Sequence, residues 1–236
     1  MTSQPAMHPD AASAPALFRD VVRGRHSTRA FLPDPVPDAV IRALLDDASR
    51  APSNCNTQPW DVHIVSGAKR DALSRALVEA FDEGNRTLDF GFDRTAYPDR
   101  FGLCGDAQAA SYYGALGIAR DARDERRAAA LRNLTFFDAP HVCLLFMPDV
   151  GDNVRVAGDI GMFGQTFLLS LVAHGLAGIP QTFLGFFADT VRACLGVPPD
   201  RKLLFGISFG HADEAHPIAG YRIDRLGIED FTTFHI

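Results

Sequence analysis

The segment at residues 24–31 reads GRHSTRAF and concentrates side chains that bind anions. Arg25, Ser27 and Arg29 alternate along it, so an extended backbone would direct all three to the same side. Guanidinium groups with a hydroxyl between them suit a phosphate, which they hold through charge-assisted and often bidentate hydrogen bonds. The segment therefore indicates a phosphate site, and a solvated surface turn is the alternative interpretation.

A second polar segment, APSNCNTQPW at residues 51–60, also differs from core sequence. Five side chains that can form hydrogen bonds lie between its two prolines, and it ends at Trp60, the only tryptophan of the chain. Loops of this kind present amide and hydroxyl groups to ligands. The segment is therefore a second candidate for ligand binding.

Other common catalytic patterns are missing from the sequence. It has no G-x-S-x-G, no H-E-x-x-H and no G-x-G-x-x-G between a strand and a helix, which argues against the corresponding hydrolases, zinc proteases and Rossmann folds. His211, His216 and His235 lack metal-ligand spacing, so we expect no metal site. The four cysteines lie far apart without a C-x-x-C pair, so we expect no disulfide framework and a cytoplasmic location.

Length and composition fit one soluble domain. The chain has 236 residues, 47% of them hydrophobic, and its formal net charge of −6 argues against nucleic acid or an anionic membrane as the main partner. No apolar run reaches the ~20 residues that a membrane span needs. We expect a flexible arm over residues 1–14, rich in Ala, Ser and Pro, and a single domain over residues 15–236.

Hydrophobic periodicity predicts an α+β domain in which many helices surround a modest sheet. Alternation or an unbroken apolar run predicts strands over residues 60–67, 141–147 and 202–210. Apolar residues at helical spacing predict helices over residues 15–23, 38–51, 68–83, 106–119, 121–134, 158–174 and 188–195. Residues 84–103 have no clean period and are predicted to form a long loop or lid.

Taken in order, RHSTRAF and APSNCNTQPW resemble two motifs of the FMN-dependent nitroreductase family. The resemblance covers about residues 17–235 and includes FFDAP at 136–140, DIGMFGQTFLLSLVAHGLAGIPQ at 159–181 and LGVPPDRKLLFGISFGHAD at 195–213. Within the family, the sequence is most similar to bacterial nitroaromatic reductases, including those that act on nitrobenzoate.

This resemblance implies a homodimer of α+β subunits, each with a central, mostly antiparallel sheet flanked by helices and a C-terminal extension swapped onto the partner subunit. Two FMN molecules would bind in the interface, each contacted by both chains. An arginine near the C-terminus would complete the phosphate site, with Arg225 the better candidate and Arg222 the second. The implied cofactor-binding residues are Arg25, His26, Ser27, Arg29, Pro52, Ser53, Asn54, Asn56, Pro180, Gln181, Thr182, Arg222 and Arg225.

The resemblance also implies the reaction. FMN would take hydride at N5 from NAD(P)H and pass it to a small aromatic oxidant, a nitroaromatic or a quinone, in a ping-pong cycle, so no acid–base dyad is needed. A backbone N–H of Gln181–Thr182 would lie near N5, and Arg29 would face the charge that reduction places on the pyrimidine. Aromatic residues would close the space above the flavin, with core or dimer contacts as the alternative role for each: Phe92, Phe101, Tyr112, Tyr113 and Phe183. Arg94 and Arg100 could meet a carboxylate such as that of a nitrobenzoate, with a solvated position on the loop as the alternative.

Two alternatives stay open. The same fold could use reduced flavin for dehalogenation, azoline oxidation or fragmentation of the flavin itself. The chain could instead be a flavin-binding protein with little turnover, which Gln181–Thr182–Phe183 would favour, because many relatives have an acidic residue and a glycine there. Bleaching of the bound flavin by NAD(P)H would separate an oxidoreductase from such a binding protein.

Overall fold

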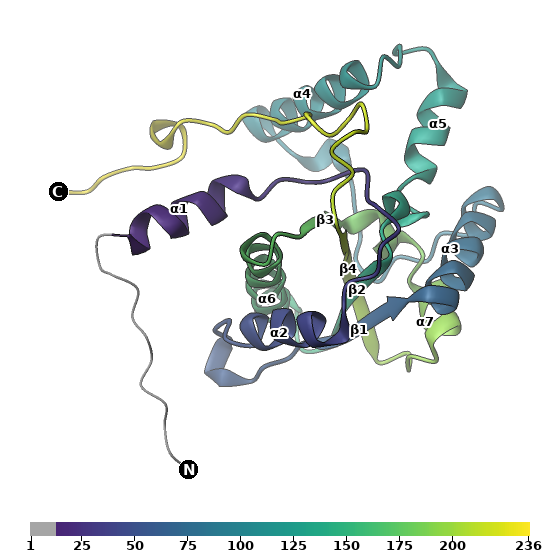
Figure 1. The fold of residues 1–236 in the computed structure, drawn as a ribbon, viewed down its shortest axis with the longest axis horizontal. Coiled ribbons are helices and arrows are strands. Elements are labelled where there is room, and N and C mark those ends of the chain that lie inside the picture. The colour runs from purple at the N-terminus through teal and green to yellow at the C-terminus, as the bar shows by residue number, and fades with distance from the viewer. Residues whose placement is uncertain (1–12) are drawn as a thin grey trace.

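The computed structural model describes residues 13–236 (Figure 1). Its four strands form one antiparallel sheet in the order β1–β2–β4–β3. The strands are β1 (Asp61–Ser66), β2 (His141–Pro148), β3 (Ala177–Gln181) and β4 (Arg201–Gly210). The α-helices are α1 (Ala14–Gly24), α2 (Asp38–Ala48), α3 (Gly67–Asp82), α4 (Asp99–Ala115), α5 (Arg123–Leu131), α6 (Val154–Ala173) and α7 (Ala188–Leu195). The predicted α+β class and antiparallel sheet are confirmed, whereas the expected arm lies almost entirely outside the described residues.

The sheet is buried on both faces, and β2 shows why. Leu144 and Phe146 belong to one hydrophobic cluster, with residues of α3 and α7, while Cys143 and Leu145 belong to a second, with residues of α2 and α6. Each face of the sheet is thus covered by a pair of helices (Figure 1). A strand buried on both faces needs apolar residues at every position, which explains the unbroken run HVCLLFM.

The sequence analysis missed β3, the edge strand. Its sequence AGIPQ is short and contains glycine and proline, so local pattern favours a loop, and only the pairing with β4 makes it regular. Pro180 is tolerated because an edge strand can lack one ladder donor. At Gly178, an added Cβ would lie 2.7 Å from Leu171 Cδ1, so this glycine lets α6 pack directly on the strand.

The predicted lid over residues 84–103 is partly wrong, because α4 begins at Asp99 rather than near residue 106. The helix has no buried residue in the described chain, so its sequence carries little of the periodic pattern that intrachain packing imposes. A short 3₁₀ turn, Arg94–Ala96, precedes it. Smaller boundary differences occur at α2, which ends at Ala48, and at α6, which begins at Val154.

Within the described part of the chain, α6 is the one helix long and apolar enough to cross a membrane by length and composition. One side of it, including Phe163, Phe167 and Leu171, is buried in the molecule, as expected of a core helix. The opposite side is exposed at Gly158 and Gly161, where an added Cβ would meet nothing within 4 Å. The helix therefore has a second face that this chain leaves uncovered.

Candidate functional site

The RHSTR segment, residues 25–29, lies beside the outer edge of β3. Ser27 forms an isolated parallel bridge with Gly178. A little further along, the Leu32 N–H donates a hydrogen bond to the carbonyl of His211 at 2.9 Å. The segment is therefore held between the sheet and the start of the C-terminal tail, which we define as residues 211–236.

His26 is fixed by hydrogen bonds inside this segment. Its Nδ1 lies 2.9 Å from the Gly24 carbonyl and its Nε2 lies 3.3 Å from the Thr28 hydroxyl. Burial lowers the pKa of His26, and nearby Arg222 and Arg25 add to that effect against the opposing Gly24 carbonyl. The imidazole is therefore a neutral hydrogen-bonding group at physiological pH, with Nδ1–H donating to the carbonyl.

Arg25 and Arg225, from opposite ends of the chain, come close together. Burial and then the Arg225 guanidinium lower the pKa of Arg25. In the described part of the chain, neither arginine has a carboxylate within ion-pair distance. Arg222 acts on His26, so both predicted tail arginines reach the RHSTR segment. Two neighbouring arginines without an ion-pair partner can hold an anion, and Glu214, which raises the pKa of His26, is an acidic group close to the segment.

Arg29 packs against two tyrosine rings that contact each other edge to face at 5.8 Å, an arrangement that we call the tyrosine clamp (Arg29, Tyr112 and Tyr221). Its guanidinium carbon is 4.7 Å from the Tyr112 ring centroid and 5.3 Å from that of Tyr221. Burial lowers the pKa of Arg29, and the two phenols oppose the shift. One N–H donates to the Ser27 carbonyl at 3.1 Å, which leaves further donors for a ligand.

The Tyr221 hydroxyl supports a ligand at this place. It is buried and has no hydrogen-bond partner among residues 13–236. Leaving a buried hydroxyl unpaired costs ~1–3 kcal/mol. Together with Arg29, it forms a donor set that fits FMN, a phosphorylated and oxygen-rich cofactor. The sequence analysis missed Tyr221 because nothing in its local spacing distinguishes it from a core or surface tyrosine.

The residues predicted to lie along the flavin, Pro180, Gln181 and Thr182, stand at the end of β3 and the start of the next turn. Pro180 and Thr182 are exposed, but Gln181 is buried. The Gln181 side chain donates to the Asn133 carbonyl at 2.9 Å and accepts from the Ser208 hydroxyl. The Gln181 side chain is therefore committed to an internal network and is not free to bind a ligand.

The APSNCN loop, residues 51–56, lies toward the opposite end of α6 from the RHSTR segment. The Asn54 N–H of the loop donates to both carboxylate oxygens of Asp159, near the start of α6. The RHSTR segment lies near the other end, because Ser27 pairs with Gly178 and Gly178 packs near Leu171. Residues 159 and 171 are ~18 Å apart along a helix axis. One chain therefore keeps the two polar segments apart. The predicted loop residues, all at least partly exposed, are Pro52, Ser53, Asn54 and Asn56.

The predicted substrate-pocket residues fall into separate groups, of which the first is an aromatic row. Phe92 contacts Phe186 at 5.5 Å between ring centroids, and Phe186 contacts Phe183 at 5.3 Å. Nearby, the buried carboxylate of Asp89 forms an ion pair with Arg192 at 2.6 Å. This pair fixes the segment that carries Phe92, so the row has a stable base on which an aromatic ligand could stack.

The second group lies on α4 and does not form one pocket wall. Tyr112 belongs to the tyrosine clamp, whereas Tyr113 lies 3.9 Å from the Arg126 guanidinium carbon. Arg100 and Phe101 contact each other at 5.0 Å, exposed in the first turn of the helix. The structure thus places Tyr112 with the cofactor segment and leaves Arg100 and Phe101 on the surface.

Arg94 and Arg100 differ in their freedom to meet a substrate carboxylate. The Arg94 guanidinium donates to the Gly102 carbonyl at 2.7 Å and pairs with Asp106 at 2.8 Å. Arg100 has no carboxylate partner among residues 13–236. Of the two, only Arg100 could receive a carboxylate without breaking an existing pair.

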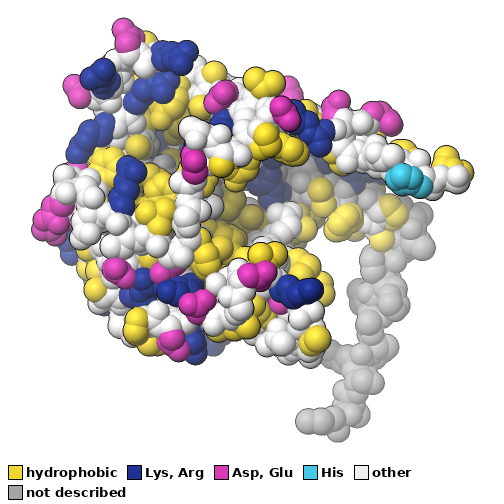
Figure 2. Space-filling view, turned by 180° about the vertical axis from the view of Figure 1, so that it is seen from behind, with side chains coloured by type: hydrophobic (Ala, Val, Ile, Leu, Met, Phe, Trp, Pro, Cys, Tyr) yellow, Lys and Arg dark blue, Asp and Glu magenta, His cyan; other side chains and the backbone are white. Residues whose placement is uncertain are grey.

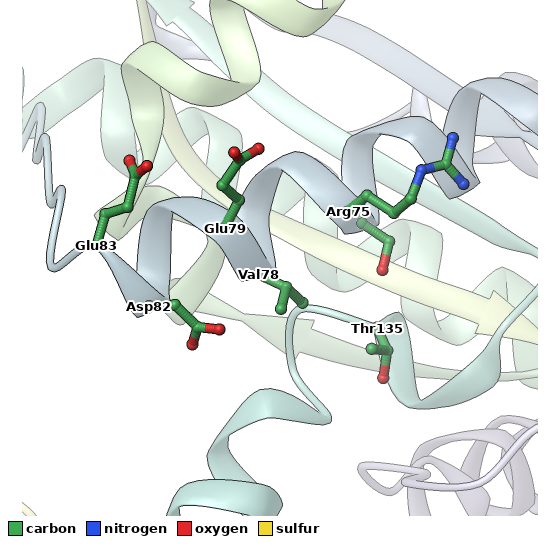
Figure 3. A pocket seen from close by; sticks show the side chains of 7 residues that line it. Arg75, Val78, Glu79, Asp82, Glu83 and Thr135 are labelled. Carbon is green, nitrogen blue, oxygen red and sulfur yellow. The ribbon is translucent and has the colours of Figure 1, made fainter.

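A separate hollow lies between α3 and Thr135 (Figure 3). Its rim carries Glu79, Asp82 and Glu83 against a single arginine, Arg75, so it would repel a phosphate. Within residues 13–236, no group of three His, Cys, Asp or Glu side chains is placed to hold a metal ion. The arginine cluster beside β3 is therefore the stronger candidate site.

The fold and this site define a class: an α+β protein with an arginine-rich segment along the edge strand of its sheet. The sequence pattern described as "Nitroreductase family" matches residues 22–211. The chain belongs to the nitroreductase family, as RHSTRAF and APSNCNTQPW predicted.

Similar proteins agree with this membership. The chain is 46% identical to "Nitroreductase NfnB" of Mycolicibacterium smegmatis over 217 residues, 91% of each chain. It is 34% identical to "4-nitrobenzoate reductase" of Nocardioides sp., covering 92% of this chain and 89% of that one. The solved structure of FMN-dependent NfnB from Mycobacterium smegmatis in complex with NADPH matches with a TM-score of 0.91 and 44% identity, over 96% of this chain and all of that one. An FMN and NADPH-dependent NfnB from Sphigopyxis sp. strain HMH matches with a TM-score of 0.88 and 31% identity, covering 92% of this chain and 98% of that one.

Proposed function

We propose that this chain is an NADPH-dependent FMN oxidoreductase that reduces nitroaromatic compounds. The observation that carries the proposal is the arginine cluster, in which Arg25, Arg29, Arg222 and Arg225 converge on β3 without carboxylate partners among the described residues. Similarity to FMN- and NADPH-dependent nitroreductases, and to 4-nitrobenzoate reductase, supports the cofactor, the reductant and the substrate class.

In this proposal each residue holds one part of the cofactor. Arg25 and Arg225 bind the phosphate, and their mutual repulsion ends when the anion lies between them. Neutral His26 and Ser27 bind the ribityl hydroxyls. Arg29, held by the tyrosine clamp, supplies positive charge to the pyrimidine edge. When bound, FMN supplies hydride transfer at N5 between the nicotinamide and the oxidant.

We propose that the active form is a homodimer in which the APSNCN loop of one subunit meets the RHSTR segment of the other across a shared FMN. The separation of these segments along α6 supports this, as do several uncovered surfaces. Helix α1 has no buried residue, and α1 and the tail project from the body together (Figure 1). Figure 2 shows hydrophobic side chains gathered around a hollow beneath the projecting part. A second copy would cover these surfaces and the open face of α6.

The oxidant would stack on the aromatic row of Phe92, Phe183 and Phe186, which suits flat nitroaromatics and quinones alike. Arg100 is our candidate for the carboxylate of a nitrobenzoate, because it has no ion pair to break. We place the protein in the cytoplasm, in keeping with four free thiols in the described chain.

The test is a spectral titration of the purified protein. A yellow preparation with absorbance near ~450 nm would identify the flavin. Anaerobic NADPH should bleach it, and 4-nitrobenzoate should restore the colour under argon. Bleaching by dithionite but not by NADPH would favour a flavin-binding protein with little turnover. A colourless protein that does not take up added FMN would refute the proposal.

A further inference from the structure

Asp159 is a buried carboxylate with an unusual set of partners. Its side chain, on α6, is only 4% exposed, and both oxygens accept the one backbone N–H of Asn54, at 3.0 and 3.1 Å. No cation pairs with it among residues 13–236. A buried charge without a counter-charge is costly, so its presence calls for a reason other than stability.

The backbone that Asp159 holds is strained. Cys55, Asn56 and Gln58 have φ angles of 52°, 55° and 48°, in the left-handed region that non-glycine residues rarely adopt. Each such residue costs ~1–3 kcal/mol and persists only where its surroundings fix it. A second bond, from the Gln58 N–H to the Ser53 hydroxyl at 2.9 Å, closes the loop on itself. The Asp159 bond is what ties this closed loop to the core.

The fluorescence of Trp60 can report how the loop at residues 51–56 packs on α6. This residue follows the loop directly, and its ring lies 5.1 Å from that of Phe163, one helical turn after Asp159. As the chain has no other tryptophan, its fluorescence measures how firmly the loop sits on α6.

We propose that Asp159 is a positioning residue, which fixes the loop backbone from inside so that the outward side chains of Asn54 and Asn56 are preset for the flavin held by the second subunit. This inference rests on the proposed function for the identity of the ligand. Nothing in the sequence singles out this carboxylate, because it lies in a long apolar helix and its partner is 105 residues away.

Two substitutions separate positioning from a purely structural role. In Asp159→Asn the side-chain carbonyl can still accept the Asn54 N–H, whereas Asp159→Leu has similar volume and no acceptor. If the carboxylate served stability, the leucine variant would unfold at lower urea concentration. As a positioning residue, Asp159→Leu should keep or raise the urea midpoint, since a costly buried charge is removed, while binding FMN at least about tenfold more weakly. The FMN affinity of Asp159→Asn should lie between that of Asp159→Leu and that of the wild type.

The readouts are the FMN dissociation constant, by flavin fluorescence, and acrylamide quenching of Trp60 in the flavin-depleted full-length chain. Quenching should increase in the order wild type, Asp159→Asn, Asp159→Leu. The matched control is Asp47→Asn, which weakens another carboxylate contact to α6, the bond from the Ser170 hydroxyl at 2.6 Å, and should leave both readouts at wild-type values. Wild-type FMN affinity in both Asp159 variants, or unchanged quenching, would overturn the proposal.

A second pair of variants tests the bond from the loop side if Asp159→Leu does not fold. Asn54→Ala removes only the side chain, whereas Asn54→Pro also removes the N–H, and the extended Ser53 before it suits a following proline. Weaker FMN binding and stronger quenching in the proline variant than in the alanine variant support the anchor, and equal behaviour contradicts it. A wild-type chain that binds no FMN would refute the proposed function, while Trp60 quenching would still decide whether Asp159 anchors the loop.

Discussion

In the proposed phosphate site, Arg25 and Arg225 illustrate how a binding residue would oppose folding in the absence of its ligand. Burial and then the nearby Arg225 guanidinium lower the pKa of Arg25, and neither arginine has an ion-pair partner in the described chain. Their contribution to stability should therefore change sign when a phosphate binds. Arg29 differs, because its charge packs against the rings of Tyr112 and Tyr221.

If Arg25 binds the phosphate, replacing it should weaken the binding of FMN but not that of riboflavin. Arg25→Ala should weaken FMN binding by about tenfold or more, since it removes a charge-assisted contact. Riboflavin lacks the phosphate, so its affinity should hardly change. The flavin-free variant should be as stable as wild type or more stable, because the repulsion with Arg225 is gone. Titrations with both flavins and thermal unfolding of the apoprotein measure this, and equal losses for FMN and riboflavin would count against the assignment.

The tyrosine clamp predicts that the ring and the hydroxyl of Tyr221 act separately. Tyr221→Phe keeps the ring against Arg29 and removes only the orphaned hydroxyl, whereas Tyr221→Leu removes both. We expect a small loss of FMN affinity in the first variant and a loss several-fold larger in the second, in line with ~0.5–2 kcal/mol for a partly buried cation–π contact. Equal affinities in the two variants would show that the ring does not matter.

At the scale of elements, His141 joins three segments at the start of β2. Its Nε2 accepts the Val36 N–H at 2.8 Å, and its Nδ1 lies 2.5 Å from the Ser66 hydroxyl. The first bond requires a neutral ring, with the proton on Nδ1 and donated to the hydroxyl. Burial lowers the pKa of His141, helped by Arg70 and opposed by Asp38. The start of the central strand thus depends on an unprotonated imidazole.

This histidine predicts acid sensitivity. As the pH falls below about 6.5, the unfolded chain binds a proton that folded His141 does not accept until lower pH, so the free energy of unfolding should decrease across that interval. Above it, the contribution of the neutral ring is fully present. Urea unfolding at pH 8 and pH 5.5 should show a smaller pH difference in His141→Gln than in wild type. The same pH dependence in both proteins would exclude His141 as its source.

Two elements that the sequence predicted well, β2 and α7, have their packing partners in the same chain, and α1, predicted within one residue at each end, has no buried residue. Strand β2 reads as buried because both of its faces meet helices, and α7 was predicted with its observed bounds. In contrast, α4 has no buried residue, and β3 becomes a strand only by pairing with β4. Local pattern was therefore weak where apolar spacing is irregular, as in α4, or where the order comes from a distant strand, as in β3.

Some residues of the candidate site could be predicted from the sequence, and others could not. Arg25, Ser27 and Arg29 could be proposed because their chemistry and alternation lie within one short segment. Tyr221 and Asp159 could not, since what marks them is an unpaired hydroxyl and a bond to a residue far away in sequence. Residue type was enough to predict a phosphate site, whereas Tyr221 and Asp159 became candidates only through the contacts that the fold shows.

At the scale of the whole molecule, the tail carries a series of exposed hydrophobic side chains with no place to pack in one subunit. They are Leu226, Ile228, Phe231 and Phe234. A chain that ends after Arg225 would keep the clamp and both tail arginines but lose this series. We expect it to fold yet to dissociate into monomers at concentrations at least about tenfold higher than wild type, since buried aromatic anchors carry much of an interface's energy.

Sedimentation velocity across a dilution series measures this dissociation, and the FMN content of each species is read at ~450 nm. In the proposed dimer, flavin should be lost as monomer appears. A wild-type chain that keeps its FMN as a stable monomer would contradict the shared site. If the truncated chain dissociates at the same concentration as wild type, the tail does not stabilise the dimer.

The bridge between Ser27 and Gly178 has a further consequence for the life of the protein in a cell. It covers part of the outer edge of β3, and a bare strand edge is a template for pairing with other chains. The segment proposed to bind FMN therefore also covers a strand edge that could otherwise promote aggregation. If FMN binds this segment as proposed, it should also hold the cover in place, so we expect the purified chain to aggregate more slowly with excess FMN than without it.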